Sequence, residues 1–144
     1  PDIAGNVGTI IRLAACLAVP IDIIEPCGFP LGDRQLKRAA MDYGAAADVT
    51  RHADWAQFQQ TCSDSGARLV LLSSHAETSL YAHRFAEHDV LLLGSESAGV
   101  PDAVRKATDI AVTIPMAAGF RSLNVAVACG IALGEAVRQT RYAA

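Results

Sequence analysis

The sequence is poor in aromatic residues and has no long apolar run. Phenylalanine, tryptophan and tyrosine make up 6% of its 144 residues, so small and aliphatic side chains must form the core. The longest apolar stretches, such as residues 90–93 and 125–133, fall well short of the ~20 residues that a membrane span needs. We therefore expect no membrane association, and a single domain over residues 1–144, because one domain typically takes roughly 100–200 residues.

Signals for metal binding, disulfides and secretion are also lacking. No cysteine pair has the C-x-x-C spacing of zinc and redox sites, and the four histidines show no metal-ligand spacing. No basic segment followed by an apolar one opens the chain, so secretion is not indicated. We expect reduced thiols, no metal and a cytoplasmic location. The residues concerned are Cys16, Cys27, Cys62, Cys129, His52, His75, His83 and His88.

An excess of positive charge is absent as well, because the formal net charge is −3. Strong non-specific nucleic-acid binding depends on many lysines and arginines, so we expect no DNA partner. An RNA partner would require positive charge to be concentrated locally. Arg34, Lys37 and Arg38 lie three and four residues apart, on one face of a predicted helix, and Arg51 is a further candidate. The plain alternative is a solvated charged face.

Helical and strand patterns alternate along the chain, which predicts an α/β fold with a mostly parallel sheet flanked by helices. Residues 1–8 read as a loop, and we expect a preceding N-terminal strand to be missing from this chain. Asp33 and Asp54 are the expected caps of two helices. The predicted helices span residues 9–17, 33–41, 53–61, 101–107 and 122–141, and the predicted strands span residues 21–24, 47–50, 69–72, 90–93 and 110–114.

The first of three chemically informative segments is residues 6–12, Asn-Val-Gly-Thr-Ile-Ile-Arg. This segment is predicted to be a polar, glycine-containing loop that leads into a helix. The free backbone N–H groups at the start of a helix favour anions. Arg12, one turn into that helix, could reach a phosphate or a reacting oxygen. A capped helix with a solvated arginine explains the same pattern.

Two further segments each follow a predicted buried strand. Residues 91–101 end a strand with Gly94-Ser95-Glu96, and Pro101 starts a helix. Ligands of open α/β sheets bind at such strand ends, although the G-x-G-x-x-G spacing of NAD sites is absent. Residues 114–124 run from Ile114 through small residues to Ser122 or Asn124, either of which can cap the last helix.

In amino-acid sequence and in order along the chain, the three segments together resemble the three signature motifs of the SPOUT superfamily, specifically the SpoU branch of RNA 2′-O-methyltransferases. The resemblance covers nearly the whole chain. Residues 23–29, 41–43 and 50–52 look like the minimal enzymes that methylate the wobble ribose of tRNA. Ala98, where that subgroup commonly has arginine, and Ser95, where proline is usual, depart from its pattern.

The resemblance implies a C-terminal deep trefoil knot, an exception to the usual rule against threaded chains. It also implies S-adenosylmethionine as the methyl donor and S-adenosylhomocysteine as the product. Backbone groups at Leu72, Gly94 and Ile114 are the expected partners of the adenine and ribose. The full set of residues carried over to the cofactor pocket is Leu72, Ser73, Gly94, Ser95, Glu96, Ile114, Met116, Ser122 and Leu123.

Arg12 matches the catalytic arginine of the resembled family. A guanidinium is effectively always protonated, so an electrostatic clamp on the developing alkoxide or its neighbouring phosphate is favoured over a general base. The residues expected to orient Arg12 and the ribose are Asn6, Glu96, Ser122 and Asn124.

The resemblance further implies a homodimer through the first and last helices. The leading functional hypothesis is wobble-position tRNA 2′-O-methylation. Methylation of ribosomal RNA or another tRNA site is the alternative within enzymes, and a non-catalytic donor- or RNA-binding module is the alternative from another class.

Overall fold

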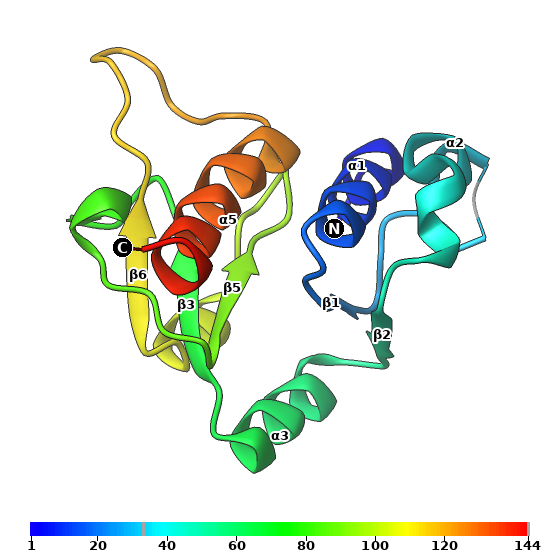
Figure 1. Ribbon diagram of the computed structural model, residues 1–144, viewed down its shortest axis with the longest axis horizontal. Helices are drawn as coiled ribbons and strands as arrows, with labels where there is room; N and C mark the ends of the chain where they lie inside the picture. The colour runs from blue at the N-terminus through cyan, green and yellow to red at the C-terminus, as the bar shows by residue number, and fades with distance from the viewer. Residues whose placement is uncertain (33, 144) are drawn as a thin grey trace. The chain divides into compact units, whose positions relative to one another are not determined.

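The computed structural model describes residues 1–32 and 34–143, which form two compact units, Pro1–Thr61 and Cys62–Ala144 (Figure 1). Asp33, the expected cap of the second helix, lies outside the described residues. The elements of the first unit are α1 (Ala4–Cys16), β1 (Ile21–Ile24), α2 (Arg34–Ala40), the 3₁₀ helix η1 (Met41–Ala45), β2 (Val49–His52) and most of α3 (Trp55–Ser65).

The first unit is built on a two-stranded parallel sheet, in which Ile21 pairs with Val49 and Ile24 with His52. Its core is the inner face of α1, packed against α2 and β1. The buried members of this core are Ala4, Val7, Ile11, Ile23, Leu36 and Ala40. Strand 21–24 was predicted with the right bounds, whereas the strand predicted at residues 47–50 begins two residues later, at Val49.

The prediction that residues 1–8 form a loop was wrong for most of that segment, because α1 begins at Ala4. Ala4, Val7, Ile11 and Ala14 are all buried, so the apolar face with helical spacing starts five residues earlier than expected. Gly8 suggested a loop, yet its role is close packing. A Cβ at Gly8 would lie 2.5 Å from the Ala39 Cβ and 2.7 Å from the Leu36 carbonyl oxygen.

Replacing Gly8 with alanine is therefore expected to destabilise the protein, although alanine favours helices. The gain in helix propensity is about 1 kcal/mol, while overpacking a well-packed contact costs about 1–3 kcal/mol. The backbone of α2 cannot give way as a flexible side chain could, so we expect a net loss of about 1 kcal/mol or more. Urea unfolding measures this change.

Gly5→Ala is the matched control, because the same helix leaves nothing within 4 Å of a Cβ at Gly5. That variant should be as stable as the wild type or slightly more so. Equal stability of Gly8→Ala and Gly5→Ala would show that α1 and α2 are not packed as described.

The second unit contains a four-stranded parallel sheet in the order β4-β6-β3-β5. This arrangement confirms the predicted α/β class with a parallel sheet and flanking helices. Its elements are β3 (Arg68–Leu72), β4 (Thr78–Ser79), the 3₁₀ helix η2 (Leu80–Ala82), β5 (Asp89–Leu93), α4 (Asp102–Lys106), β6 (Ile110–Thr113) and α5 (Val125–Arg141).

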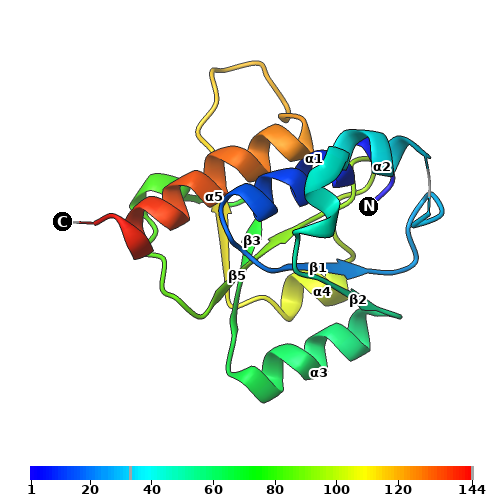
Figure 2. The same ribbon diagram turned by 45° about the vertical axis from the view of Figure 1, so that its right-hand side comes forward.

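Helix α5 runs along one face of this sheet (Figures 1 and 2). Ala132 of α5 is fully buried with Val70 of β3 and Val112 of β6, and Leu80 completes this core. The small side chain of Ala132 therefore allows α5 to pack closely against the sheet. Residues 75–88 contain the edge strand β4 and the buried Leu80. Because β4 pairs with β6, this segment is part of the sheet.

The amino ends of β3 and β5 are joined by an ion pair. Arg68 Nε and Nη2 donate to the two carboxylate oxygens of Asp89, at 2.6 and 2.7 Å. Burial raises the pKa of Asp89, but hydrogen bonds from Arg68 and a backbone N–H outweigh it, so this pKa lies below its ordinary value. The pair helps to fix the register in which Arg68 lies opposite Asp89.

All four cysteines are free. Cys62 and Cys129 are buried, and burial raises the pKa of Cys129 to about 11. Cys16 is exposed.

No helix in residues 1–32 and 34–143 is long and apolar enough to cross a membrane.

Candidate active site

The carboxyl ends of β3, β5 and β6 lie side by side in the second unit. Leu72, the last residue of β3, pairs with Leu93 on one side and with Val112 on the other. The Ser73 N–H donates to the Val112 carbonyl at 2.9 Å, just beyond the strand end. The turns that begin at Ser73, Gly94 and Ile114 therefore leave the same edge of the sheet. These are the turns that the family resemblance predicts to form a cofactor site, at the edge where open α/β sheets bind ligands.

The strand order gives this edge a further feature. The chain passes from β3 to the edge strand β4, then to β5 at the opposite edge, and returns to β6 between β3 and β4. Ligands of open parallel sheets bind outside the carboxyl ends of the strands, where the connecting loops diverge. Leu72, Ile114 and Met116 are half-buried at or near these strand ends. Apolar side chains among backbone polar groups are typical of a small-molecule site.

The turn after β5 is closed by its own backbone. The Ser95 N–H donates to the Gly99 carbonyl and the Gly99 N–H donates to the Ser95 carbonyl, both at 3.0 Å. A Cβ at Gly94 would lie 2.7 Å from the Gly99 carbonyl carbon, so only glycine fits at this position. Ser95, the residue that departs from the usual proline, accepts from the Ala98 N–H through its hydroxyl at 3.3 Å. Glu96 is half-buried within this turn.

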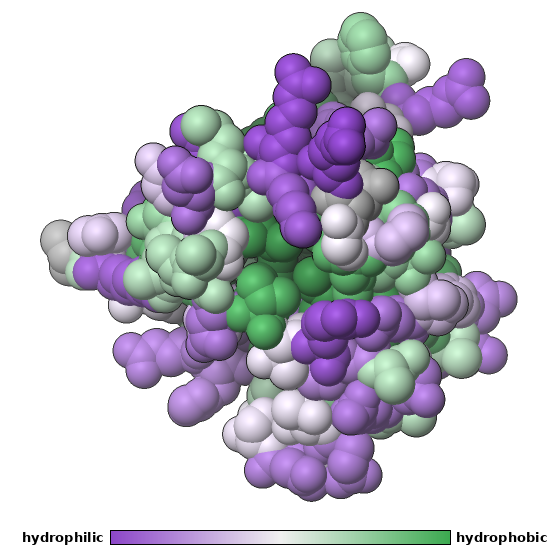
Figure 3. Space-filling model, turned by 90° about the vertical axis from the view of Figure 1, so that its right-hand side faces the viewer, coloured by the Kyte–Doolittle hydropathy of each residue, from purple (hydrophilic) through white to green (hydrophobic). Residues whose placement is uncertain are grey.

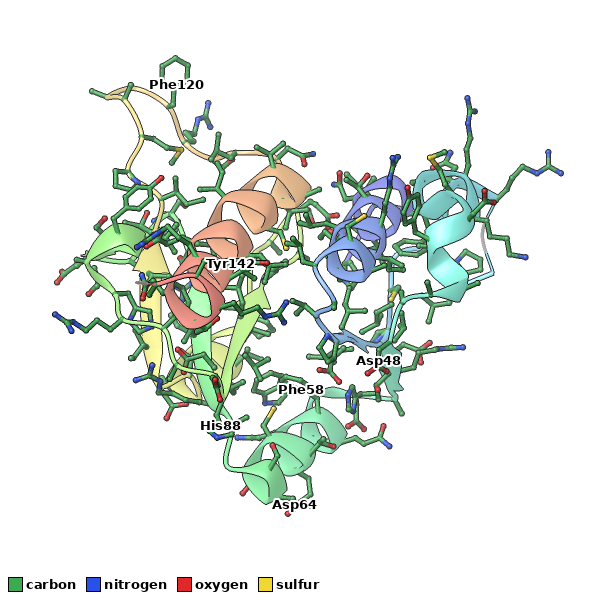
Figure 4. The ribbon with its side chains drawn as sticks, in the orientation of Figure 1. Asp48, Phe58, Asp64, His88, Phe120 and Tyr142 are labelled. Atoms are coloured by element: carbon green, nitrogen blue, oxygen red, sulfur yellow. The ribbon has the colours of Figure 1, made fainter. Side chains whose placement is uncertain are left out.

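The segment between β6 and α5 extends away from the sheet (Figure 1). Asn124 caps α5, since its Oδ1 accepts from the N–H groups of Ala126 and Val127 at 2.9 and 3.2 Å. Of the two caps that were considered, Asn124 is therefore the one used. Ser122 and Leu123 are exposed just before it. Phe120, which is 74% exposed, points outward from this segment (Figure 4).

Arg12 lies on the exposed side of α1, in the first unit. Its Nη1 donates to the Met41 Sδ at 2.9 Å, and its Cζ lies 5.0 Å from the centroid of the Tyr43 ring. Asn6 is half-buried in the first turn of the same helix. Residues six apart on an α-helix are separated by about 120° around its axis, so Asn6 and Arg12 do not share a face.

The basic residues expected to bind RNA divide into two groups. Arg34, Lys37 and Arg38 are all exposed on α2, three and four residues apart as predicted. Arg51 of β2 instead forms an ion pair with Glu25, Nη2 to Oε1, at 2.9 Å. That pair partly neutralises Arg51, so α2 is the stronger candidate for phosphate contact. The face in Figure 3 is largely hydrophilic, around a smaller apolar area.

The predicted site residues thus fall into two groups by unit. Asn6, Arg12 and the basic residues belong to the first unit, and the expected cofactor residues belong to the second. Within the second unit, the structure brings the three strand-end turns together at one edge. The contacts of Arg12 with Met41 and Tyr43 were not foreseen, because no spacing rule links a helix to a turn 29 residues later in the chain.

These features define a class: an α/β protein in which turns meet at the carboxyl ends of parallel strands, the edge where open α/β sheets bind ligands. Residues 1–134 match the model of the SpoU rRNA Methylase family, and the chain belongs to that family. The family resemblance inferred from the three motifs is therefore confirmed.

Two relatives are similar over most of their own lengths. A tRNA (cytidine(34)-2′-O)-methyltransferase of Ancylobacter novellus is 48% identical over 140 residues, which are 97% of this chain and 89% of the relative. A solved structure described as giving insights into the 2-OH methylation of C/U34 on tRNA has a TM-score of 0.91 and 43% identity, covering 96% of this chain and 90% of that one.

A third relative is the SpoU methyltransferase AviRb from Streptomyces viridochromogenes, solved in complex with the cofactor AdoMet. Its TM-score is 0.90 at 28% identity, covering 96% of this chain and 57% of that one.

Proposed function

We propose that this protein transfers a methyl group from S-adenosylmethionine to the ribose 2′-hydroxyl at the wobble position of tRNA, on cytidine or a modified uridine. One observation carries the proposal: nearly the whole chain is alike in sequence and structure to proteins named for that reaction. The three converging strand-end turns and the exposed Arg12 supply the parts that this reaction requires. Retention of these parts argues against a non-catalytic binding module.

The turns after β3, β5 and β6 fit the proposed cofactor. An adenosine has a flat apolar face and a polar edge, and the half-buried Leu72, Ile114 and Met116 lie among backbone N–H and C=O groups. The resemblance adds Ser73, Gly94, Ser95, Glu96, Ser122 and Leu123 to this pocket. When bound, S-adenosylmethionine supplies a methyl group activated by its sulfonium. AviRb, which shares the fold, is solved with this cofactor.

Arg12 would stabilise the charge that develops on the ribose oxygen as the methyl group is transferred. Its guanidinium stays protonated, which makes it a poor general base but a good electrostatic clamp on an alkoxide or a neighbouring phosphate. Much of the rate should come from holding the oxygen in line with the methyl carbon. Glu96, Ser122 and Asn124 are proposed to orient the arginine and the ribose, and Asn6, which lies on another face of α1, is proposed to orient the ribose.

The wider assembly is proposed on the same grounds. The family model runs through both units, which supports their joining as one methyltransferase domain. Insertion of β6 between β3 and β4, strands that precede it in the chain, supports the trefoil knot. Ile3 beside α1, and Leu123 and Val127 at the start of α5, are large and exposed, which supports a homodimer through the first and last helices.

The substrate partner is proposed to be tRNA, bound by Arg12 and by the exposed α2 residues Arg34, Lys37 and Arg38, with a smaller contribution from the paired Arg51. Neither DNA nor a metal has a part in this reaction. A cytoplasmic location is proposed as well, and a tRNA substrate supports it.

The test is to incubate the protein with labelled S-adenosylmethionine and either total tRNA or ribosomal RNA, and to map methylated riboses by mass spectrometry. We expect label in tRNA at nucleotide 34. Label confined to ribosomal RNA or to another tRNA position would overturn the substrate assignment, and absence of label with both RNAs would overturn the activity.

A further inference from the structure

Two residues of the 3₁₀ helix η1, Met41 and Tyr43, contact the Arg12 guanidinium. The Met41 Sδ accepts a hydrogen bond from Arg12 Nη1 at 2.9 Å, and the Tyr43 ring lies with its centroid 5.0 Å from the Arg12 Cζ. A thioether accepts hydrogen bonds weakly, and an aromatic ring attracts a cation through its face. Together these contacts restrict an otherwise flexible side chain to a narrower range of positions.

The backbone that carries these two residues is itself well fixed. Helix η1 packs against α1, and α2 immediately before it crosses α1 so closely that only glycine fits at position 8. Met41 has a φ of +52°, in the left-handed region that side chains other than glycine rarely adopt. Such a conformation persists where its surroundings impose it, and it often marks a functional position.

The contacts of Met41 and Tyr43 with Arg12 contribute little to the stability of the fold. Met41 is 55% exposed and Tyr43 is 41% exposed, so neither side chain serves the core. No carboxylate of the described residues forms an ion pair with Arg12, in contrast to Arg51, which Glu25 holds at 2.9 Å. A carboxylate would fix a guanidinium but neutralise it and compete with phosphate. A sulfur and a ring fix it while most of its five N–H donors and its full charge stay available.

We infer that Met41 and Tyr43 are positioning residues, which hold Arg12 ready for the ribose oxygen and adjacent phosphate without neutralising it. The inference rests on the proposed role of Arg12 in methyl transfer. Met41 limits the swing of the guanidinium by one hydrogen bond, and Tyr43 limits it by its ring face. Their effect is on the fraction of time that Arg12 spends in the productive position, so their loss should lower kcat.

The test compares Tyr43→Leu, which removes the ring face, with Tyr43→Phe, which keeps it. We expect Tyr43→Leu to lower kcat about tenfold, because misplacement by about 1 Å can cost more than that, with the KM for S-adenosylmethionine and the Tm unchanged. Tyr43→Phe should restore most of the turnover.

Met41→Leu removes the sulfur acceptor and should lower kcat by about threefold, because it removes the weaker restraint. Tyr81→Leu, at a tyrosine 61% exposed in the second unit, is the matched surface control.

A double variant separates positioning from a general structural role. In an Arg12→Ala background, Tyr43→Leu should cause no further loss of single-turnover rate, because the ring acts through the arginine. A further loss in the double variant, or wild-type kcat in Tyr43→Leu, would overturn the inference. Neither result would contradict the proposed role of Arg12 itself. If the wild type methylates no RNA, the proposed function fails first, and the two failures are thereby distinguished.

Discussion

Arg12→Ala is expected to lower the rate of methyl transfer to tRNA by about 10²-fold or more, the size of effect seen when one oxyanion-stabilising donor is removed. The reason is that negative charge grows on the ribose oxygen only as the new bond forms, so the guanidinium acts mainly in the transition state. Arg12 lies on the exposed side of α1, and its removal leaves no buried group unpaired. Single-turnover labelling measures the rate.

The affinity for S-adenosylmethionine should stay within a few-fold of the wild type in Arg12→Ala, because Arg12 is proposed to act on the ribose oxygen and its phosphate, whereas other residues are proposed to hold the adenosine. Calorimetric titration checks this expectation. Arg12→Lys, which keeps a charge but loses the planar fork of donors, should have an intermediate rate. Wild-type turnover in Arg12→Ala would remove the residue from the mechanism.

Gly94→Ala is expected to weaken binding of S-adenosylmethionine about tenfold or more. Its new methyl would meet the backbone of Gly99 and Val100, so the turn after β5 must open. Overpacking of this kind costs about 1–3 kcal/mol, and each 1.4 kcal/mol is about tenfold in affinity. Titration of the cofactor into folded protein measures the effect.

Gly5→Ala again controls for the substitution itself, because it adds the same methyl to an open position. Unchanged cofactor affinity in Gly94→Ala, with the fold intact, would mean that this turn does not form the binding site.

Most of the secondary structure followed from the sequence because its signals are local. Short strands such as β1 and β5 stand out because they are rich in branched apolar residues. Asp54 caps the helix that follows it, accepting from the Gln57 N–H at 2.8 Å. The start of α1 was missed because Gly8 signals a turn in isolation, whereas its reason is contact with α2, which only the tertiary structure provides. Strand β4 has two residues, too few for any period to show.

The candidate site was predictable only in part, for a related reason. Parallel strands end at a common edge, so an alternating pattern suffices to bring the turns after β3, β5 and β6 together. The contacts that Arg12 makes depend on how α2 and η1 fold back on α1, and Met41 adopts a conformation that its residue type disfavours. No pattern within a single element encodes such an arrangement.

A crystal structure with bound S-adenosylhomocysteine tests the central claim most directly. We predict that the adenosine is held by backbone groups of Leu72, Gly94 and Ile114, with the sulfur facing the guanidinium of Arg12. A product molecule bound away from these three turns would contradict the claim. So would one bound there with the Arg12 guanidinium of neither protomer near its sulfur.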